Sequence, residues 1–275
     1  AGPGRPLHIV GFSNGGALAL KYALDALDDA ALPRVERLVL VSPMVGITEF
    51  ARFAGIAGLP AFLPRFAKAA WLGLVPEFNP FKYNSFPVNG ARQSFRVTQV
   101  LQDRIRQHAR GGTLAGMPPI LTFQSAMDST VSTRAIVDAL YRRLPANGSA
   151  LVLFDLNRAA KLGLLLRPDL ETMLARLLPP APRDFEVSVI TNASAGAGGV
   201  VERTTPARST QETERPLSLA FPPDVFSLSH VALPFPETDG LYGSNPDPAD
   251  DFGIQLGTIA ARGERGALIV ALDAL

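Results

Sequence analysis

One short segment near the amino end, residues 7–24, constrains the fold of this chain more than any other. It joins an apolar strand-like run to a helix-like run through a turn, residues 11–15, that reads GFSNG and fits the pattern G-x-S-x-G. A serine on a strained strand-to-helix turn holds its hydroxyl clear of the backbone. We interpret the turn as a nucleophile elbow with Ser13 as the nucleophile. The alternative is a turn that only connects a strand to a helix.

Two further features of this segment suit that chemistry. Gly11 and Gly15 stand two residues on either side of Ser13, where glycine lets strand and helix approach without Cβ clashes. The helix that follows directs the partial positive charge of its amino end at an oxyanion formed on an attacked carbonyl. The segment therefore predicts attack by the serine on a carbonyl carbon.

The composition of the chain excludes several classes of function. Its 275 residues, 47% of them hydrophobic, are enough for one large domain with a core. The formal charge of +1 gives no electrostatic reason to expect nucleic acid as a partner. Cysteine is absent and histidine occurs three times, so we expect no metal site, and the predicted chemistry needs no cofactor. No apolar run reaches the length of a membrane span, and we expect a soluble, by default cytoplasmic, protein.

Apolar, β-rich runs recur along the chain at residues 38–41, 120–124 and 150–154. Such runs are typical of strands buried on both faces of a parallel sheet, and helix-like segments separate them as in βαβ units. We therefore predict the α/β class, with a mostly parallel sheet and flanking helices. From about residue 192 to 215 the composition turns to Gly, Ala, Ser, Thr and charge, which predicts a flexible loop.

The composition changes again between residues 49 and 117. This segment holds eight of the sixteen phenylalanines and the only tryptophan, and prolines interrupt its first half. We predict a helical cap that lines an apolar acyl-binding pocket, with Phe53, Phe62 and Trp71 as pocket residues together with Phe12 beside the serine. The alternative is that these aromatics form the core of an inserted subdomain. Flanking lysines and arginines suit peripheral contact with a membrane surface, although a solvated face is the simpler explanation.

A serine hydroxyl is a weak nucleophile that needs a base, and the base needs a group that fixes its tautomer. Asp128 follows the strand at 120–124, at the strand end where open α/β sheets place their chemistry. Asp155 ends the next strand and is the rival. We favour Asp128 as the acid, with an Asx turn or a helix cap as its structural alternative.

Histidine is the residue type best suited to the base, because its ordinary pKa lies near neutral pH. His8 lies inside the strand before the elbow, and we interpret it as structural, pointing into the sheet or its flanking layer. His108 lies among polar residues on a helix, which indicates a solvated face. His230 remains, on a predicted loop late in the chain, and it is our candidate base.

The chain order serine, aspartate, histidine is that of the α/β-hydrolases, and the sequence resembles this superfamily. Within it, the resemblance is to the lysophospholipase or monoacylglycerol-lipase-like branch, also described as serine aminopeptidase-like. The residues that carry the resemblance are 8–16 (HIVGFSNGG), 38–43 (LVLVSP), 128–131 (DSTV) and His230. It implies that Ser13 is the nucleophile, Asp128 the acid and His230 the base, with the amide of Asn14 as one oxyanion donor.

The sequence departs from the family in three respects. The family has several strands, and a loop with the second oxyanion amide, before the nucleophile strand, whereas six residues precede Leu7 here. We therefore expect a missing N-terminal segment of the same protein as a partner of this chain. The separation between Asp128 and His230 is long for the family. Gln124 and Ser125 stand where the family often carries a glycine before the acid.

Together these observations predict an α/β-hydrolase fold that lacks its first strands. We divide it into hydrolase core at residues 1–48, a helical cap at 49–117 and hydrolase core again at 118–275. The predicted function is a serine hydrolase that cleaves carboxylic esters of apolar acyl groups, in small molecules or lipids, through an acyl-enzyme. Two alternatives stay open: a peptidase, amidase or acyltransferase with the same triad, and a non-catalytic binding protein with this fold.

Overall fold

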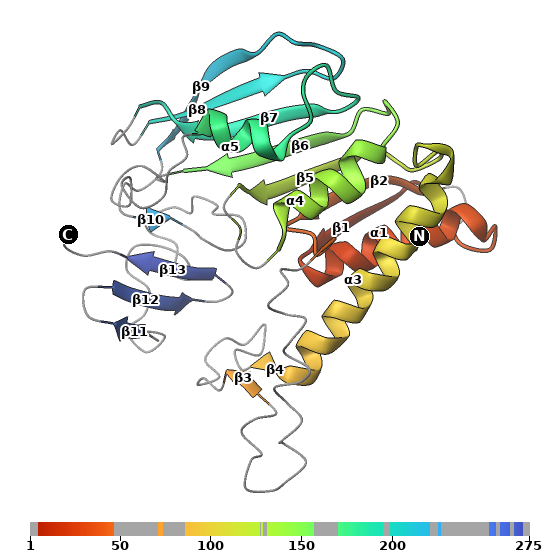
Figure 1. The fold of residues 1–275 in the computed structure, drawn as a ribbon, viewed down its shortest axis with the longest axis horizontal. Helices are drawn as coiled ribbons and strands as arrows, with labels where there is room; N and C mark the ends of the chain where they lie inside the picture. Colours follow the sequence, from red (N-terminus) through yellow and green to blue (C-terminus); the bar gives the residue numbers. More distant parts are fainter. Residues whose placement is uncertain are drawn as a thin grey trace, which may run out of the picture.

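The computed structural model describes residues 5–46, 71–73, 86–126, 128, 131–156, 170–194, 199–220, 225–226, 253–256, 259–264 and 267–271. The largest feature within them is a twisted seven-stranded sheet with helices packed against it (Figure 1). The sheet provides the frame on which the candidate site residues lie.

The strand order of this sheet is β1-β2-β5-β6-β7-β8-β9. The strands are β1 (Leu7–Phe12), β2 (Val35–Val41), β5 (Ile120–Ser125), β6 (Ala150–Asp155), β7 (Glu186–Asn192), β8 (Gly199–Thr205) and β9 (Thr213–Ala220). Neighbours from β1 to β7 are parallel, and β8 and β9 extend the sheet as antiparallel strands. The carboxyl ends of β1, β2, β5 and β6 therefore meet at one edge, where ligands bind in open α/β sheets.

Helices connect the parallel strands. They are α1 (Asn14–Asp28), α3 (Val88–His108) with its 3₁₀ extension η3 (Ala109–Gly111), α4 (Thr133–Ala135) continued by η4 (Ile136–Leu140) and η5 (Tyr141–Arg143), and α5 (Leu170–Leu177). Because the parallel strands advance across the sheet in one direction, right-handed crossovers place these helices on a single face. Side chains from all four packed helices meet alternate strand residues there in one core, which includes Leu20, Leu40, Ile105, Leu140 and Leu153.

The opposite face of the sheet carries a smaller apolar cluster. Phe154, Leu156 and Val200 form its buried part, near the β6 and β8 region. On β1, which is an edge strand of the described sheet, Val10 is 73% exposed and Phe12 is 55% exposed. The two faces of the sheet therefore differ: one is fully packed by helices, and the other is open at its β1 end among the described residues.

This architecture confirms the predicted α/β class, with a mostly parallel sheet and flanking helices, and it is consistent with the predicted α/β-hydrolase fold. The strands predicted from apolar runs are confirmed as β2, β5 and β6. They could be found from the sequence because a strand buried on both faces needs an apolar residue at almost every position.

The loop predicted at about residues 192–215 is wrong for the residues described there, since β8 and the first residues of β9 fall within it. These strands are polar because they extend the sheet at its edge, where half of each strand faces water. Cross-strand ion pairs between Arg203 and Glu214 and between Arg215 and Glu202 align them. The polar composition of this segment therefore led to the prediction of a loop where the chain forms a hairpin of β8 and β9.

Two smaller sheets complete the described chain. One is the pair β3 (Trp71–Gly73) and β4 (Phe86–Pro87), and the other has the order β10-β13-β12-β11, with β10 at Val225–Phe226, β11 at Gly253–Leu256, β12 at Ile259–Glu264 and β13 at Ala267–Ala271. About half of the predicted cap at 49–117, residues 49–70 and 74–85, lies outside the described residues. Its last helix, α3, packs on α1, and the boundaries of the three predicted segments stay a prediction.

Candidate active site

The elbow at Ser13 has the strained backbone that the motif predicts. Ser13 lies between β1 and α1 with φ 49° and ψ −116°, a conformation that non-glycine residues rarely adopt. Its N–H donates to the carbonyl of Val41 on β2 (2.9 Å), and its own carbonyl accepts from the N–H groups of Gly16 and Met44 (3.0 Å each). The turn is thus fixed from the neighbouring strand, from the helix and from the loop after β2.

Glycine is required at two positions of the elbow, and one of them differs from our prediction. A Cβ on Gly11 would lie 2.8 Å from the carbonyl oxygen of Gly15 and 2.8 Å from the Cα of Gly16, so strand and helix touch there as predicted. A Cβ on Gly15 would meet nothing within 4 Å, which contradicts the role we gave that residue. The second close approach is at Gly16, whose Cβ would lie 2.8 Å from the Cβ of Pro43.

At the start of α1 the hydroxyl of Ser13 does not cap the helix, although serine often has that role. Ser13 is the N-cap residue of α1, yet its side chain makes no capping hydrogen bond. Asn14 is the first residue of the helix, and amides of a first turn have no carbonyl partner within their own helix. The side-chain Oδ1 of Asn14 is buried and has no hydrogen-bond partner among the described residues. These features suit the predicted use of the Asn14 amide as an oxyanion donor.

Asp128 lies in the turn after β5, half-buried, and both of its carboxylate oxygens accept hydrogen bonds. Oδ1 accepts from the backbone N–H of Val131 (2.9 Å) and Oδ2 accepts from Nε2 of Gln124 (3.1 Å). Since β5 is two strands from β1, the ends of the two strands are about 10 Å apart. A single imidazole between Ser13 and Asp128 could bridge a separation of that order.

Asp155, the rival acid, ends β6 and is 6% exposed. Its strand is three positions from β1, or about 14 Å across the sheet. Asp128 is nearer to the elbow by one strand and lies in a turn beyond its strand end. The sheet order therefore favours Asp128 over Asp155 as the acid of a site at Ser13.

The two described histidines both lie away from Ser13. His8 is exposed on β1, which corrects our expectation that it would point into the sheet, and five residues of extended strand separate it from Ser13 by about 16 Å. Nε2 of His108 lies 3.2 Å from Oδ2 of Asp28 at the far end of α1, about 20 Å along that helix from the elbow. His108 is 15% exposed at its side chain, so it is not on a solvated face. His230 lies outside the described residues.

The predicted substrate pocket is described only at two of its residues. Phe12 precedes the serine and is exposed, and Trp71 begins β3. Phe53 and Phe62 lie outside the described residues. No helix among the described residues is long and apolar enough to cross a membrane, and those residues place no group of three or more His, Asp or Glu where it could hold a metal.

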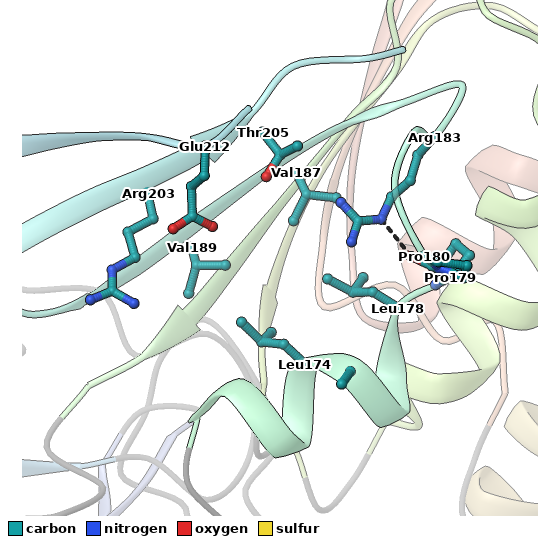
Figure 2. A pocket seen from close by; sticks show the side chains of 11 residues that line it. Leu174, Leu178, Pro179, Pro180, Arg183, Val187, Val189, Arg203, Thr205 and Glu212 are labelled. Atoms are coloured by element: carbon teal, nitrogen blue, oxygen red, sulfur yellow. Dashed lines mark hydrogen bonds between the residues drawn. The ribbon is translucent and has the colours of Figure 1, made fainter. Parts of the chain in front are cut away.

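A cavity of about 330 Å³ lies elsewhere, between α5 and the strands β7 and β8 (Figure 2). Leu174, Leu178, Val187 and Val189 form its apolar wall, and Arg183 points into it (Figure 2). Burial lowers the pKa of the Arg183 guanidinium, and the carboxylate of Glu212 opposes that effect. The cavity is four strand positions from β1, so it is separate from the elbow.

Two contacts at the site were not predicted from the sequence. The first is the approach of Pro43 to the start of α1, and the second is the hydrogen bond from Gln124 to Asp128. Gln124 had been singled out only as a departure from the family pattern. The four-residue spacing between Gln124 and Asp128 carries no signal by itself, because the contact depends on how the intervening turn folds.

Comparisons with known proteins give little beyond this geometry. No protein-family model matches the chain, and no curated protein matches it. Among solved structures, it is similar to the crystal structure of a soluble variant of monoglyceride lipase from Saccharomyces cerevisiae in complex with a substrate analog, with 13% identity and a TM-score of 0.38. The match covers 55% of this chain and 53% of that chain, so the chain spans about half the length of that structure. Our fold assignment rests on the strand order and the elbow.

Proposed function

We propose that this protein is a serine hydrolase that cleaves carboxylic esters of apolar acyl groups through an acyl-enzyme. The observation that carries the proposal is the elbow: Ser13 has a strained backbone at a strand-to-helix turn, and its hydroxyl caps no helix. Backbone strain of this kind costs about 1–3 kcal/mol and persists where the surroundings enforce it. At the same edge of the sheet, Asp128 is held by two hydrogen bonds.

In this proposal the imidazole of His230 accepts the proton of the Ser13 hydroxyl as Oγ attacks the ester carbonyl. The amide of Asn14 donates to the oxyanion that forms, and the positive end of α1 adds to its stabilisation. Asp128 fixes the tautomer of His230 and stabilises the imidazolium. The imidazolium then protonates the leaving alcohol, and a water activated by His230 releases the acid from Ser13.

His230 is assigned by elimination. The sequence has three histidines, and the two described ones lie about 16 and 20 Å from the elbow, as judged from strand and helix rise. His230 is the fourth residue after the end of β10, and it is the one remaining histidine of the sequence. The proposal therefore requires the segment after β10 to bring His230 to the ends of β1 and β5.

The finer features of the proposal concern the substrate and the partners. An apolar acyl group and an enzyme of the lysophospholipase or monoacylglycerol-lipase-like kind are proposed from the aromatic residues Phe12, Phe53, Phe62 and Trp71. Peripheral contact of the cap with a membrane belongs to the same proposal.

The direct test is reaction of the full chain with a fluorophosphonate probe, followed by mapping of the labelled peptide. We expect one label, on Ser13, and hydrolysis of p-nitrophenyl esters that is lost in Ser13→Ala. The matched control is Ser132→Ala, a serine that caps a helix and should neither be labelled nor be required for turnover. If Ser13 is not labelled and both variants hydrolyse esters alike, the protein is not a serine hydrolase and a binding role becomes the better explanation.

A further inference from the structure

Gln124 occupies an unusual position for a polar side chain. It lies near the end of β5, in the middle of the sheet, and is 0% exposed. Its Nε2 is 3.1 Å from Oδ2 of Asp128 and 3.0 Å from Oγ1 of Thr133. The side chain thus connects the turn that holds the proposed acid with the first residue of α4.

Nε2 of Gln124 faces three acceptors, of which the carbonyl oxygen of Ser125 is the most distant, at 3.4 Å. The hydroxyl of Thr133 donates to the carbonyl of Ser125 (2.9 Å), so its oxygen is free to accept from Gln124. The two hydrogens of the Gln124 amide then point at Thr133 and at Asp128. An ionised carboxylate would repel the amide oxygen, so the amide nitrogen must face Asp128.

The same side chain leaves one atom unsatisfied. Oε1 of Gln124 is buried and has no hydrogen-bond partner among the described residues. An unpaired buried carbonyl is unfavourable, and an apolar side chain of similar volume would avoid it. The stability of the core therefore does not explain a glutamine at this position. The contact that an apolar side chain would lose is the charge-assisted hydrogen bond to Asp128.

We propose that Gln124 is a positioning residue that orients the carboxylate of Asp128 toward the imidazole of the base. This inference rests on the proposed function, because it assigns Gln124 its effect through the acid of that site. With Oδ1 accepting from Val131 N–H and Oδ2 accepting from Gln124, the carboxylate plane is held from two sides. Without Gln124 the carboxylate loses a charge-assisted hydrogen bond that helps to fix its rotation.

The test is a double-mutant cycle in the full chain with Gln124→Met and Asp128→Asn, read out as ester hydrolysis and as the rate of fluorophosphonate labelling. Methionine keeps the length and volume of glutamine but donates no hydrogen bond. We expect Gln124→Met to lower kcat about ten- to hundredfold with little change in KM, because misplacing a catalytic group by about 1 Å costs up to about a hundredfold. In the Asp128→Asn background, Gln124→Met should have no further effect.

A matched control separates positioning from loss of stability. Ser149 is also a buried polar residue of the same sheet, but it binds the amide of Ile120 at the opposite end of β5. Ser149→Ala should lower the thermal unfolding midpoint and leave kcat of the folded protein unchanged. Gln124→Met should lower kcat without lowering the thermal unfolding midpoint.

The outcomes distinguish this inference from the function on which it rests. If Ser13→Ala retains turnover and labelling, the proposed function fails. If Ser13→Ala abolishes turnover and Asp128→Asn lowers it to a small but measurable rate, but Gln124→Met changes kcat less than twofold, only the positioning role is overturned. Equal effects of Gln124→Met with and without Asp128 would also overturn it, since they would show that Gln124 does not act through the acid.

Discussion

Two serines of this protein stand directly before helices, and the structure treats them differently. Ser132 precedes α4 with extended backbone (φ −72°, ψ 103°), and its Oγ accepts a hydrogen bond from the N–H of Ala135 (3.1 Å). Ser13 precedes α1 with φ 49° and ψ −116°, and its side chain makes no such bond. Extended backbone at an N-cap lets the side-chain oxygen reach the amides of the first turn. The strained elbow turns the hydroxyl of Ser13 away from them.

The same residue type at the start of a helix therefore has a structural role at Ser132 and has no capping role at Ser13. The start of α4 gains a cap, which stabilises a helix by about 1 kcal/mol. The start of α1 forgoes the cap and carries backbone strain in addition. Contacts from Val41, Gly16 and Met44 hold the strained turn in place. Substitutions at the two helix starts test this difference.

Ser13→Ala should reduce ester hydrolysis about 10⁴-fold or more, because a triad acts as a unit and fails when its nucleophile is removed. Its free energy of unfolding should stay within about 0.5 kcal/mol of wild type, since no capping bond is lost. Steady-state kinetics and urea unfolding measure the two effects. A Ser13→Ala protein that is clearly destabilised would show that the hydroxyl has a structural role after all.

Gly11→Ala should lower the free energy of unfolding by about 3 kcal/mol, because its Cβ would meet the backbone of Gly15 and Gly16 at 2.8 Å, and backbone cannot move aside cheaply. Gly15→Ala is the matched control. Its Cβ has open space within helix α1, so it should stabilise the protein by about 0.5–1 kcal/mol through helix propensity. Urea unfolding of both variants is the measurement, and a loss of similar size in both would contradict the packing we describe.

Ser132→Ala should destabilise the protein by about 1 kcal/mol, the usual value of a lost N-cap, with turnover within about twofold of wild type. Ser13→Gly should instead stabilise it by about 1 kcal/mol, because glycine relieves the strain at positive φ. Thermal unfolding of the pair should therefore move in opposite directions. Movement in the same direction would mean that the two helix starts are not as different as their dihedral angles indicate.

The smallest effect concerns the other end of α1. Hydrogen bonding to Arg104 on α3, with the charges of His108 and Arg104, holds the pKa of Asp28 below its ordinary value. A depressed carboxyl pKa stabilises the fold above the ordinary value of about 3.9, and this stability is lost as pH falls through the lower, folded pKa. Wild type should therefore lose stability below about pH 4. Arg104→Gln should lack that part of the loss, and Ser13 reactivity near neutral pH should be unaffected.

Much of the fold could be predicted because its signals are local. The strands β2, β5 and β6 are apolar runs that the sequence shows directly. The polar strand β8 was missed, because at the edge of a sheet pairing with a neighbour replaces burial as the organising contact. The solvated face predicted for His108 was also wrong, because its ion-pair partner Asp28 is distant in sequence.

The candidate site also has features that the sequence predicts and contacts that it does not. The elbow motif, the placing of Asp128 after a strand and the chain order of serine, acid and histidine are properties of the sequence. That Gly16 and not Gly15 packs tightly depends on Pro43, which approaches from another strand end. That Gln124 reaches Asp128 depends on the path of the turn between them.

Local sequence patterns specify which segments form the parallel strands and where the elbow serine lies, because strand burial and the elbow turn are encoded within a few neighbouring residues. Which residues meet at the strand ends depends on the tertiary structure. There the order of strands brings together residues such as Ser13 and Met44 that are distant along the chain, and no local pattern specifies such contacts.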